Sequence, residues 1–85
     1  MELRFSASFG SDYRNLPHHL QVTLEKKLGM LLKNPRYPSL NVKKMEGFGY
    51  IFEARITKGY RFTFQKEKYG YLIRRAGPHD ILRNP

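Results

Sequence analysis

The chain has 85 residues, so we expect one domain, residues 1–85, with a single small core. Lysine and arginine total 16 against 7 acidic residues, and the net charge of +9 predicts a polyanionic partner, either nucleic acid or an acidic protein. The alternative of a merely soluble basic domain, without such a partner, is not excluded by the charge alone. The absence of cysteine excludes disulfides, thiolate metal sites and thiol catalysis, and no apolar run has the length of a membrane span. With no signal-peptide core at its start, the sequence favours a cytoplasmic protein without a membrane partner.

The amino-terminal half predicts one strand followed by two helices. Alternation of apolar and polar residues indicates a half-buried strand over residues 3–7. Apolar side chains at helical spacing suit a short helix over residues 9–16. A leucine stripe then predicts a second helix that Pro17 opens and Asn34 ends. The connection that follows is rich in proline and glycine, and residues 39–42 are its candidate extended piece.

The carboxyl-terminal half predicts a β-meander. Residues 52–56 and 60–65 alternate between apolar and polar side chains, as two strands of a hairpin do. Residues 57–59 are expected to form a three-residue loop in which Gly59 supplies the left-handed conformation. A third strand follows a turn at residues 66–70. With both helices on one face of the sheet, the predicted fold is α+β, a β-α-α-β-β-β chain whose antiparallel sheet packs on two amino-terminal helices.

The hairpin register gathers charged side chains on one sheet face. If Ile56 faces Tyr60, then Arg55 lies opposite Arg61, and Glu53 lies diagonal to Arg61. Like charges directly opposite each other destabilise a sheet, so the two arginines need an anion nearby. Either Glu53 offsets them on a solvated face, or they bind a phosphate, which arginine grips with two parallel hydrogen bonds.

A histidine follows the third strand of the meander, in the run Gly77-Pro78-His79-Asp80. His79 is either a turn residue that packs locally or a group placed for proton transfer, to which histidine is suited. Asp80 either orients the ring or caps the short turn. His18 and His19 lack metal-ligand spacing with other residues, so no metal site is predicted.

Other side chains are candidates for contact with RNA. Phe48 and Tyr50 stand beside glycines and are possible stacking platforms for bases, whereas Tyr60 and Tyr71 follow the apolar alternation and are expected in the core. Five further basic residues are expected to contact RNA: Lys43, Lys44, Lys58, Arg74 and Arg83.

In the order and spacing of its motifs, the chain resembles the RelE/ParE superfamily of bacterial toxins. The resemblance covers residues 16–85 and rests on LLKNPRYPSLNVKKMEG, then FEARITKGYRFTF, then a strand ending in GPHDILRNP. It is strongest toward a RelE-like subgroup with EAR, GYR and terminal GxHD motifs. It implies the β-α-α-β-β-β fold with a twisted sheet, and a toxin that an acidic antitoxin protein binds and neutralises.

The resemblance also implies a chemistry. RelE-like members cleave messenger RNA on the ribosome, and so inhibit translation, without a metal or other cofactor. By position, Arg61 matches the arginine that steadies the scissile phosphate, and Glu53 and Arg55 fall where members assist the attack. His79 falls near the leaving group. On this basis we expect Glu53 to be the general base and His79 the general acid, with both arginines stabilising the transition state.

Other functions stay open from the sequence. Several family members carry a tyrosine after the last strand, and residues 80–85 contain none, so a catalytically impaired binding protein of the toxin fold is one alternative. ParE-like members use the same fold to block DNA gyrase, and a fold alone does not settle a function. The third alternative function is that of an RNA-binding protein outside any toxin system.

Overall fold

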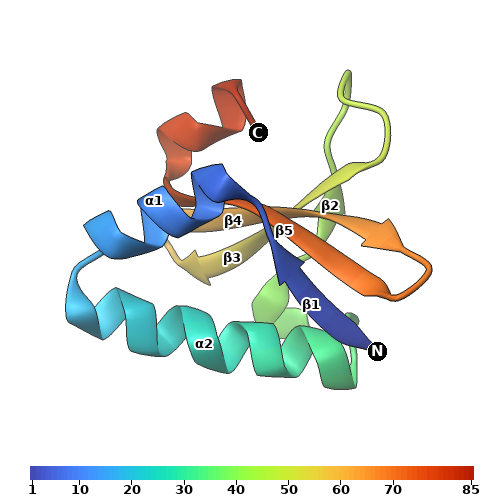
Figure 1. Cartoon of the computed structure of the whole chain (residues 1–85), viewed down its shortest axis with the longest axis horizontal. Coiled ribbons are helices and arrows are strands. Elements are labelled where there is room, and N and C mark those ends of the chain that lie inside the picture. Colours follow the sequence, from blue (N-terminus) through green and yellow to red (C-terminus); the bar gives the residue numbers. More distant parts are fainter.

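The computed structural model describes all 85 residues as five strands, two α-helices and two 3₁₀ helices (Figure 1). In chain order the elements are β1 (Glu2–Phe5), α1 (Ala7–Asn15), α2 (His18–Lys33), η1 (Pro38–Leu40), β2 (Lys43–Lys44), β3 (Ile51–Thr57), β4 (Tyr60–Glu67), β5 (Gly70–Pro78) and η2 (His79–Arg83). The α+β class, both helices and the four expected strands are confirmed. None of the helices is both long and apolar enough to cross a membrane.

The strands form one sheet in the order β1-β5-β4-β3-β2. Strands β3, β4 and β5 make the expected antiparallel meander. The sheet is mixed rather than antiparallel throughout, because β1 pairs in parallel with β5, with Leu3 opposite Tyr71. A parallel pair needs a long connection between its strands, and everything from α1 to β4 lies between these two.

The main core lies between α2 and one face of the sheet (Figure 1). The buried residues of α2 recur every three or four positions and form a single stripe: Leu20, Leu24, Leu28 and Leu31. On the sheet side, Phe62 and Phe64 of β4 are fully buried. Because each fully buried side chain of this size stabilises a fold by about 1.5–3 kcal/mol, this layer supplies much of the stability.

Helix α1 packs at the β5 side of the sheet, and the hydroxyl of its N-cap residue, Ser6, links it to β5. Ser6 Oγ accepts the N–H of Phe9 at 3.0 Å and donates to the carbonyl oxygen of Arg74 at 2.6 Å. One side chain therefore caps the helix and ties its start to β5. Phe9 is the buried residue of this helix.

The connection before β3 differs in detail from the expected extended piece at residues 39–42. Pro38 to Leu40 form η1, which buries Leu40, and Asn41 then adopts the left-handed conformation with φ of 49°. Only after this reversal does the chain extend, as the two-residue strand β2 at the edge of the sheet.

The β3–β4 hairpin has the predicted register along most of its length. Arg55 lies opposite Arg61, and Glu53 lies opposite Thr63. The period-two alternation of side chains was sufficient to fix this part of the pairing, because a one-residue slip would have moved the apolar residues out of the core.

The turn of the hairpin differs from the prediction. Thr57, rather than Ile56, pairs with Tyr60, so the loop has two residues, and Gly59 is not among the glycines with positive φ. The register shifts between Arg55 and Thr57, and Ile56 is the extra residue of a β-bulge. The bulge keeps Ile56 in the core, where it is 2% exposed.

The carboxyl-terminal segment, residues 79–85, folds back over the face of the sheet opposite α2 (Figure 1). On that face, which we call the open face, it covers Thr63 completely and buries its own Ile81 and Pro85. The loop before β3 rises on the same side, at the far edge of the sheet (Figure 1). The two segments thus flank the part of the open face that β3 and β4 form.

Candidate functional site

On the open face, Glu53 lies between two basic side chains. Lys43 is its register partner in β2, and directly paired residues share a face. From β4, the Nε of Arg61 lies 3.8 Å from Glu53 Oε1, and these two side chains are only 13% and 21% exposed. The carboxylate is therefore half-buried within a basic surface.

The guanidinium of Arg61 is fixed by the hairpin turn. Its Nη1 donates to the carbonyl oxygens of Thr57, Lys58 and Tyr60 at 2.7, 2.9 and 3.1 Å. These three acceptors hold the side chain over the turn, while Nη2 donates no hydrogen bond within the protein. Arg61 thus stabilises the hairpin and keeps one donor group available to a ligand.

Arg55 carries the one buried side-chain polar atom of the protein that has no hydrogen-bond partner, its Nε. The residue directly opposite is another arginine, Arg61. A buried donor without an acceptor costs about 1–3 kcal/mol, and like charges facing each other on a sheet add a further penalty of about 0.2–1 kcal/mol. An anion bound between the two guanidinium groups would remove the like-charge penalty, which is the chemistry of a phosphate site.

His79 emerges beside this pair. It is the first residue after β5, and Gly77, two residues earlier, is the register partner of Arg61. His79 is exposed, and no hydrogen bond fixes its ring. No side-chain hydrogen bond caps η2, so Asp80 does not cap it, and its action on the ring stays a prediction. No group of three His, Asp or Glu side chains is arranged to hold a metal ion.

The residues expected to contact RNA do not all lie together. Lys43 shares the open face with Glu53, whereas Lys44, as the next residue of the strand, points to the other face. Lys58 is in the β3–β4 turn, and Arg83 is exposed at the end of η2. Contact with RNA stays a prediction for each of them.

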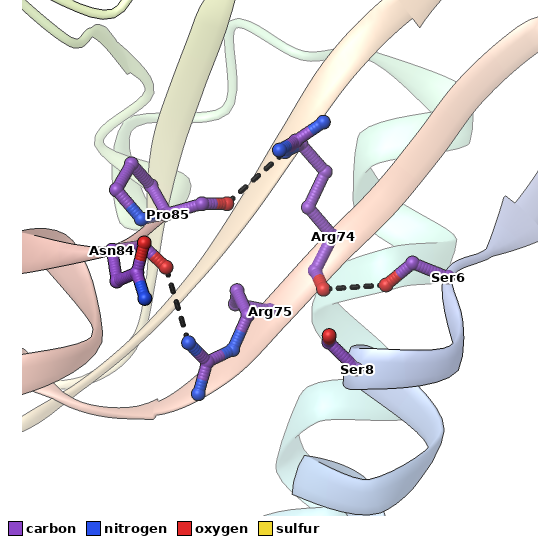
Figure 2. A pocket seen from close by; sticks show the side chains of 6 residues that line it. All are labelled: Ser6, Ser8, Arg74, Arg75, Asn84 and Pro85. Carbon is purple, nitrogen blue, oxygen red and sulfur yellow. Dashed lines mark hydrogen bonds between the residues drawn. The ribbon is translucent and has the colours of Figure 1, made fainter.

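The sequence predicts that Arg74 contacts RNA, but in the structure its side chain makes hydrogen bonds within the protein. It lines a polar hollow of about 230 Å³ beside the carboxyl-terminal segment (Figure 2), together with Ser6, Ser8, Arg75, Asn84 and Pro85. Its Nη1 donates to Gln65 Oε1 at 2.8 Å, and its Nε donates to the backbone oxygen of Pro85 at 3.0 Å. Arg74 is therefore already engaged by the protein itself.

The sequence does not predict a role for Arg75 or for Asp12. In the structure, the two carboxylate oxygens of Asp12 accept hydrogen bonds from Nε and Nη2 of Arg75 at 2.7 and 3.1 Å. These hydrogen bonds raise the pKa of the Arg75 guanidinium above its usual value. The one sequence signal for this arrangement is the Arg74-Arg75 pair, because two consecutive basic residues interrupt the alternation of apolar and polar residues along β5. They mark a β-bulge, at which Arg74 has no register partner in β4.

The aromatic residues divide as the sequence predicts. Phe48 and Tyr50 are 40% and 65% exposed, on the loop that rises beside the open face. Tyr71 is buried, and Tyr60 is half-buried and packs against the core. The two loop aromatics thus remain free to stack on a ligand.

No protein-family model and no curated protein sequence matches the chain. Among solved structures, it is similar to YafQ from E. coli, with a TM-score of 0.79 and 13% identity over 95% of this chain and 96% of that chain. It is equally similar to the YoeB/ParE toxin from Agrobacterium tumefaciens, with a TM-score of 0.79 and 15% identity over 93% and 99% of the two chains. A chain of the intact E. coli RelBE toxin–antitoxin complex gives a TM-score of 0.70 and 23% identity over 89% and 93%.

The chain has the RelE/ParE toxin fold. The match extends over nearly the whole length of both chains in each comparison, so the fold that the EAR and GYR motifs imply is confirmed. The narrower grouping by a terminal GxHD motif stays a prediction. In this RelE/ParE fold, the open face carries Glu53, Arg55 and Arg61, with His79 at its edge.

Proposed function

We propose that this protein is the toxin of a type II toxin–antitoxin system and that it cleaves messenger RNA, on the ribosome. The RelE/ParE fold supports the toxin assignment. The observation that carries the catalytic assignment is the Arg55–Arg61 pair, in which a buried Nε lacks an acceptor and no carboxylate pairs with Arg55. A scissile phosphate is the anion that this pair would bind.

In the proposed reaction the 2′-hydroxyl of the substrate attacks the adjacent phosphorus. Glu53 accepts the hydroxyl proton as the O2′–P bond forms, and His79 donates a proton to the 5′ oxygen as the P–O5′ bond breaks. The products are a 2′,3′-cyclic phosphate and a 5′-hydroxyl. Arg55 and Arg61 stabilise the charge that accumulates on the phosphate oxygens, and each positioned acid or base contributes roughly 10²–10⁴-fold.

The partner that restrains this activity is proposed to be an acidic antitoxin. The net charge of +9 favours a negatively charged partner through complementary potentials. One structure that shares the fold is a toxin–antitoxin complex, that of E. coli RelBE. The expected finding is a short acidic reading frame next to this gene, whose co-expression restores growth.

Controlled expression in bacteria tests the function. The parent protein should arrest growth, and His79→Ala should abolish the arrest while remaining soluble. His19→Ala, which changes an exposed histidine at the start of α2, is the matched control and should arrest growth like the parent. Because Arg61 also holds the hairpin turn, Arg55→Met is the cleaner test of the phosphate site. The nuclease assignment fails if His79→Ala and Arg55→Met are as toxic as the parent.

A block of DNA gyrase is the second candidate, since one structure that shares the fold is described as a YoeB/ParE toxin. The two functions differ in their products. A gyrase blocker produces DNA breaks and an SOS response with intact messages, and its toxicity would not depend on His79 as a proton donor.

A further inference from the structure

The carboxyl-terminal segment is held on the open face at both of its ends. At the start, Ile81 lies on Gly77, where an added Cβ would come within 2.9 Å of Ile81 Cγ2. A larger residue at position 77 would push the Ile81 side chain away from the sheet. Ile81 is 8% exposed and Pro85 is buried, so the segment packs as part of the domain.

At its far end, the segment is held through the backbone oxygens of two residues. Nη1 of Arg75 donates to the carbonyl oxygen of Asn84 at 3.1 Å, and Nε of Arg74 donates to the backbone oxygen of Pro85 at 3.0 Å (Figure 2). Thr63 Oγ1 adds a donor to the Pro85 oxygen at 3.3 Å. Hydrogen bonds from charged donors are the stronger ones, so the two arginines carry most of this attachment.

Arg75 is oriented in turn by Asp12 of α1, 63 residues away in the chain. The carboxylate binds the guanidinium through two parallel hydrogen bonds at 2.7 and 3.1 Å, and Asp12 Oδ2 also accepts the N–H of Ala76 at 3.1 Å. Two bonds fix the plane of the guanidinium, which aims the remaining Nη1 at Asn84. A lysine at this position could not make the same set of contacts.

The consequence concerns His79, the first residue of this segment. No hydrogen bond fixes its ring, so the position of the ring depends on where the segment lies. We propose that Asp12 and Arg75 are positioning residues that hold residues 79–85 on the sheet and thereby set the place of the His79 imidazole. The catalytic part of this proposal rests on the proposed function, and a displacement of about 1 Å can slow a positioned reaction by roughly 10²-fold.

Amide hydrogen exchange measured by NMR tests the attachment without any assay of activity. The N–H of Asn84 donates to Ile81 O at 3.0 Å and reports on the segment, while the amides of β4 report on the core. Asp12→Asn and Arg75→Lys should speed the exchange at Asn84 by about tenfold, as expected for a lost charge-assisted contact, and leave β4 unchanged. Glu2→Gln, which breaks the exposed pair with Arg4, is the control and should change neither.

A double-mutant cycle tests the link to His79. In a purified translation reaction, Asp12→Asn should lower the single-turnover cleavage rate roughly 10–100-fold at saturating toxin. In a His79→Ala background the same substitution should lower the residual rate less than twofold, because Asp12 acts through His79. If the parent protein does not cleave RNA at all, the proposed function fails, but the exchange experiment still decides whether the attachment exists.

Two results would overturn the proposal. One is unchanged exchange at Asn84 in both Asp12→Asn and Arg75→Lys. The other is a loss of cleavage as large in the His79→Ala background as in the parent. If Asp12→Asn and Arg75→Lys do not fold, Thr63→Val removes only one hydroxyl contact with the segment. That variant should speed the exchange at Asn84 by about fivefold, and unchanged exchange would contradict the attachment.

Discussion

Replacing Arg55 with methionine should raise the stability of this protein and lower its proposed cleavage activity. Methionine keeps the length and apolar stem of the side chain but removes the buried Nε that has no acceptor and the charge that faces Arg61. The first change removes a penalty of about 1–3 kcal/mol and the second one of about 0.2–1 kcal/mol. We expect a net gain of about 1 kcal/mol, at the low end of these penalties, which raises the Tm of a domain this size by about 4–8 °C.

Thermal unfolding followed by circular dichroism measures this gain. Arg14→Met is the matched control, because Arg14 is exposed on α1 and should change the free energy of unfolding by less than about 0.5 kcal/mol. Arg61→Met should instead lower the Tm, because it removes three hydrogen bonds to the hairpin turn. The contrast between Arg55 and Arg61 separates the ligand-binding arginine from the one that also supports the fold.

Inorganic phosphate extends the same experiment to the proposed ligand. A ligand that binds only the folded state stabilises it, so phosphate should raise the Tm of the parent and of Arg14→Met more than that of Arg55→Met. Cleavage or toxicity should fall by roughly 10²–10³-fold in Arg55→Met, as for the loss of one transition-state donor. A Tm of Arg55→Met at or below that of the parent, with equal phosphate effects in both, would refute the anion site.

Three further predictions concern the fold and the surface. Gly70→Ala should destabilise the protein by at least about 1–3 kcal/mol in urea unfolding, because Gly70 has a φ of +148° and an added Cβ would lie 2.1 Å from a backbone oxygen of β1. Gly29→Ala, on the exposed face of α2, is the control and should stabilise the protein by up to about 1 kcal/mol. Burial raises the pKa of the Tyr71 hydroxyl, so its contribution to stability is complete below about pH 10 and is lost as the pH rises through the raised pKa. Urea midpoints should therefore fall more steeply above that pH in the parent than in Tyr71→Phe. Tyr50→Ala should weaken RNA binding in a filter assay by about 1–3 kcal/mol with an unchanged Tm, since its ring is 65% exposed.

The features that the sequence predicts are those encoded locally. The leucine stripe of α2 repeats within one element, and the alternation in β3 and β4 is strong enough to place Arg55 opposite Arg61. Local periodicity suffices for these because a slip of one residue would expose the apolar side chains.

What the sequence does not predict depends on contacts between distant segments. The parallel pairing of β1 with β5 follows from the path of the whole chain, and the bulge at Ile56 follows from the need to keep that side chain buried. The bond between Asp12 and Arg75 joins residues 63 positions apart, with no pattern in either segment that points to the other. The close contact of Ile81 with Gly77 is also not predictable from the sequence, because it depends on how the folded segment packs against β5.

Mapping of messenger RNA ends after brief induction tests the central claim most directly. The parent should generate new 5′ ends that are phased with codons and carry a 5′-hydroxyl. His79→Ala should generate them at least about 10²-fold less often, and His19→Ala should match the parent. Intact messages in arrested cells that express the parent, or new ends that are as abundant in His79→Ala as in the parent, would contradict the proposed nuclease.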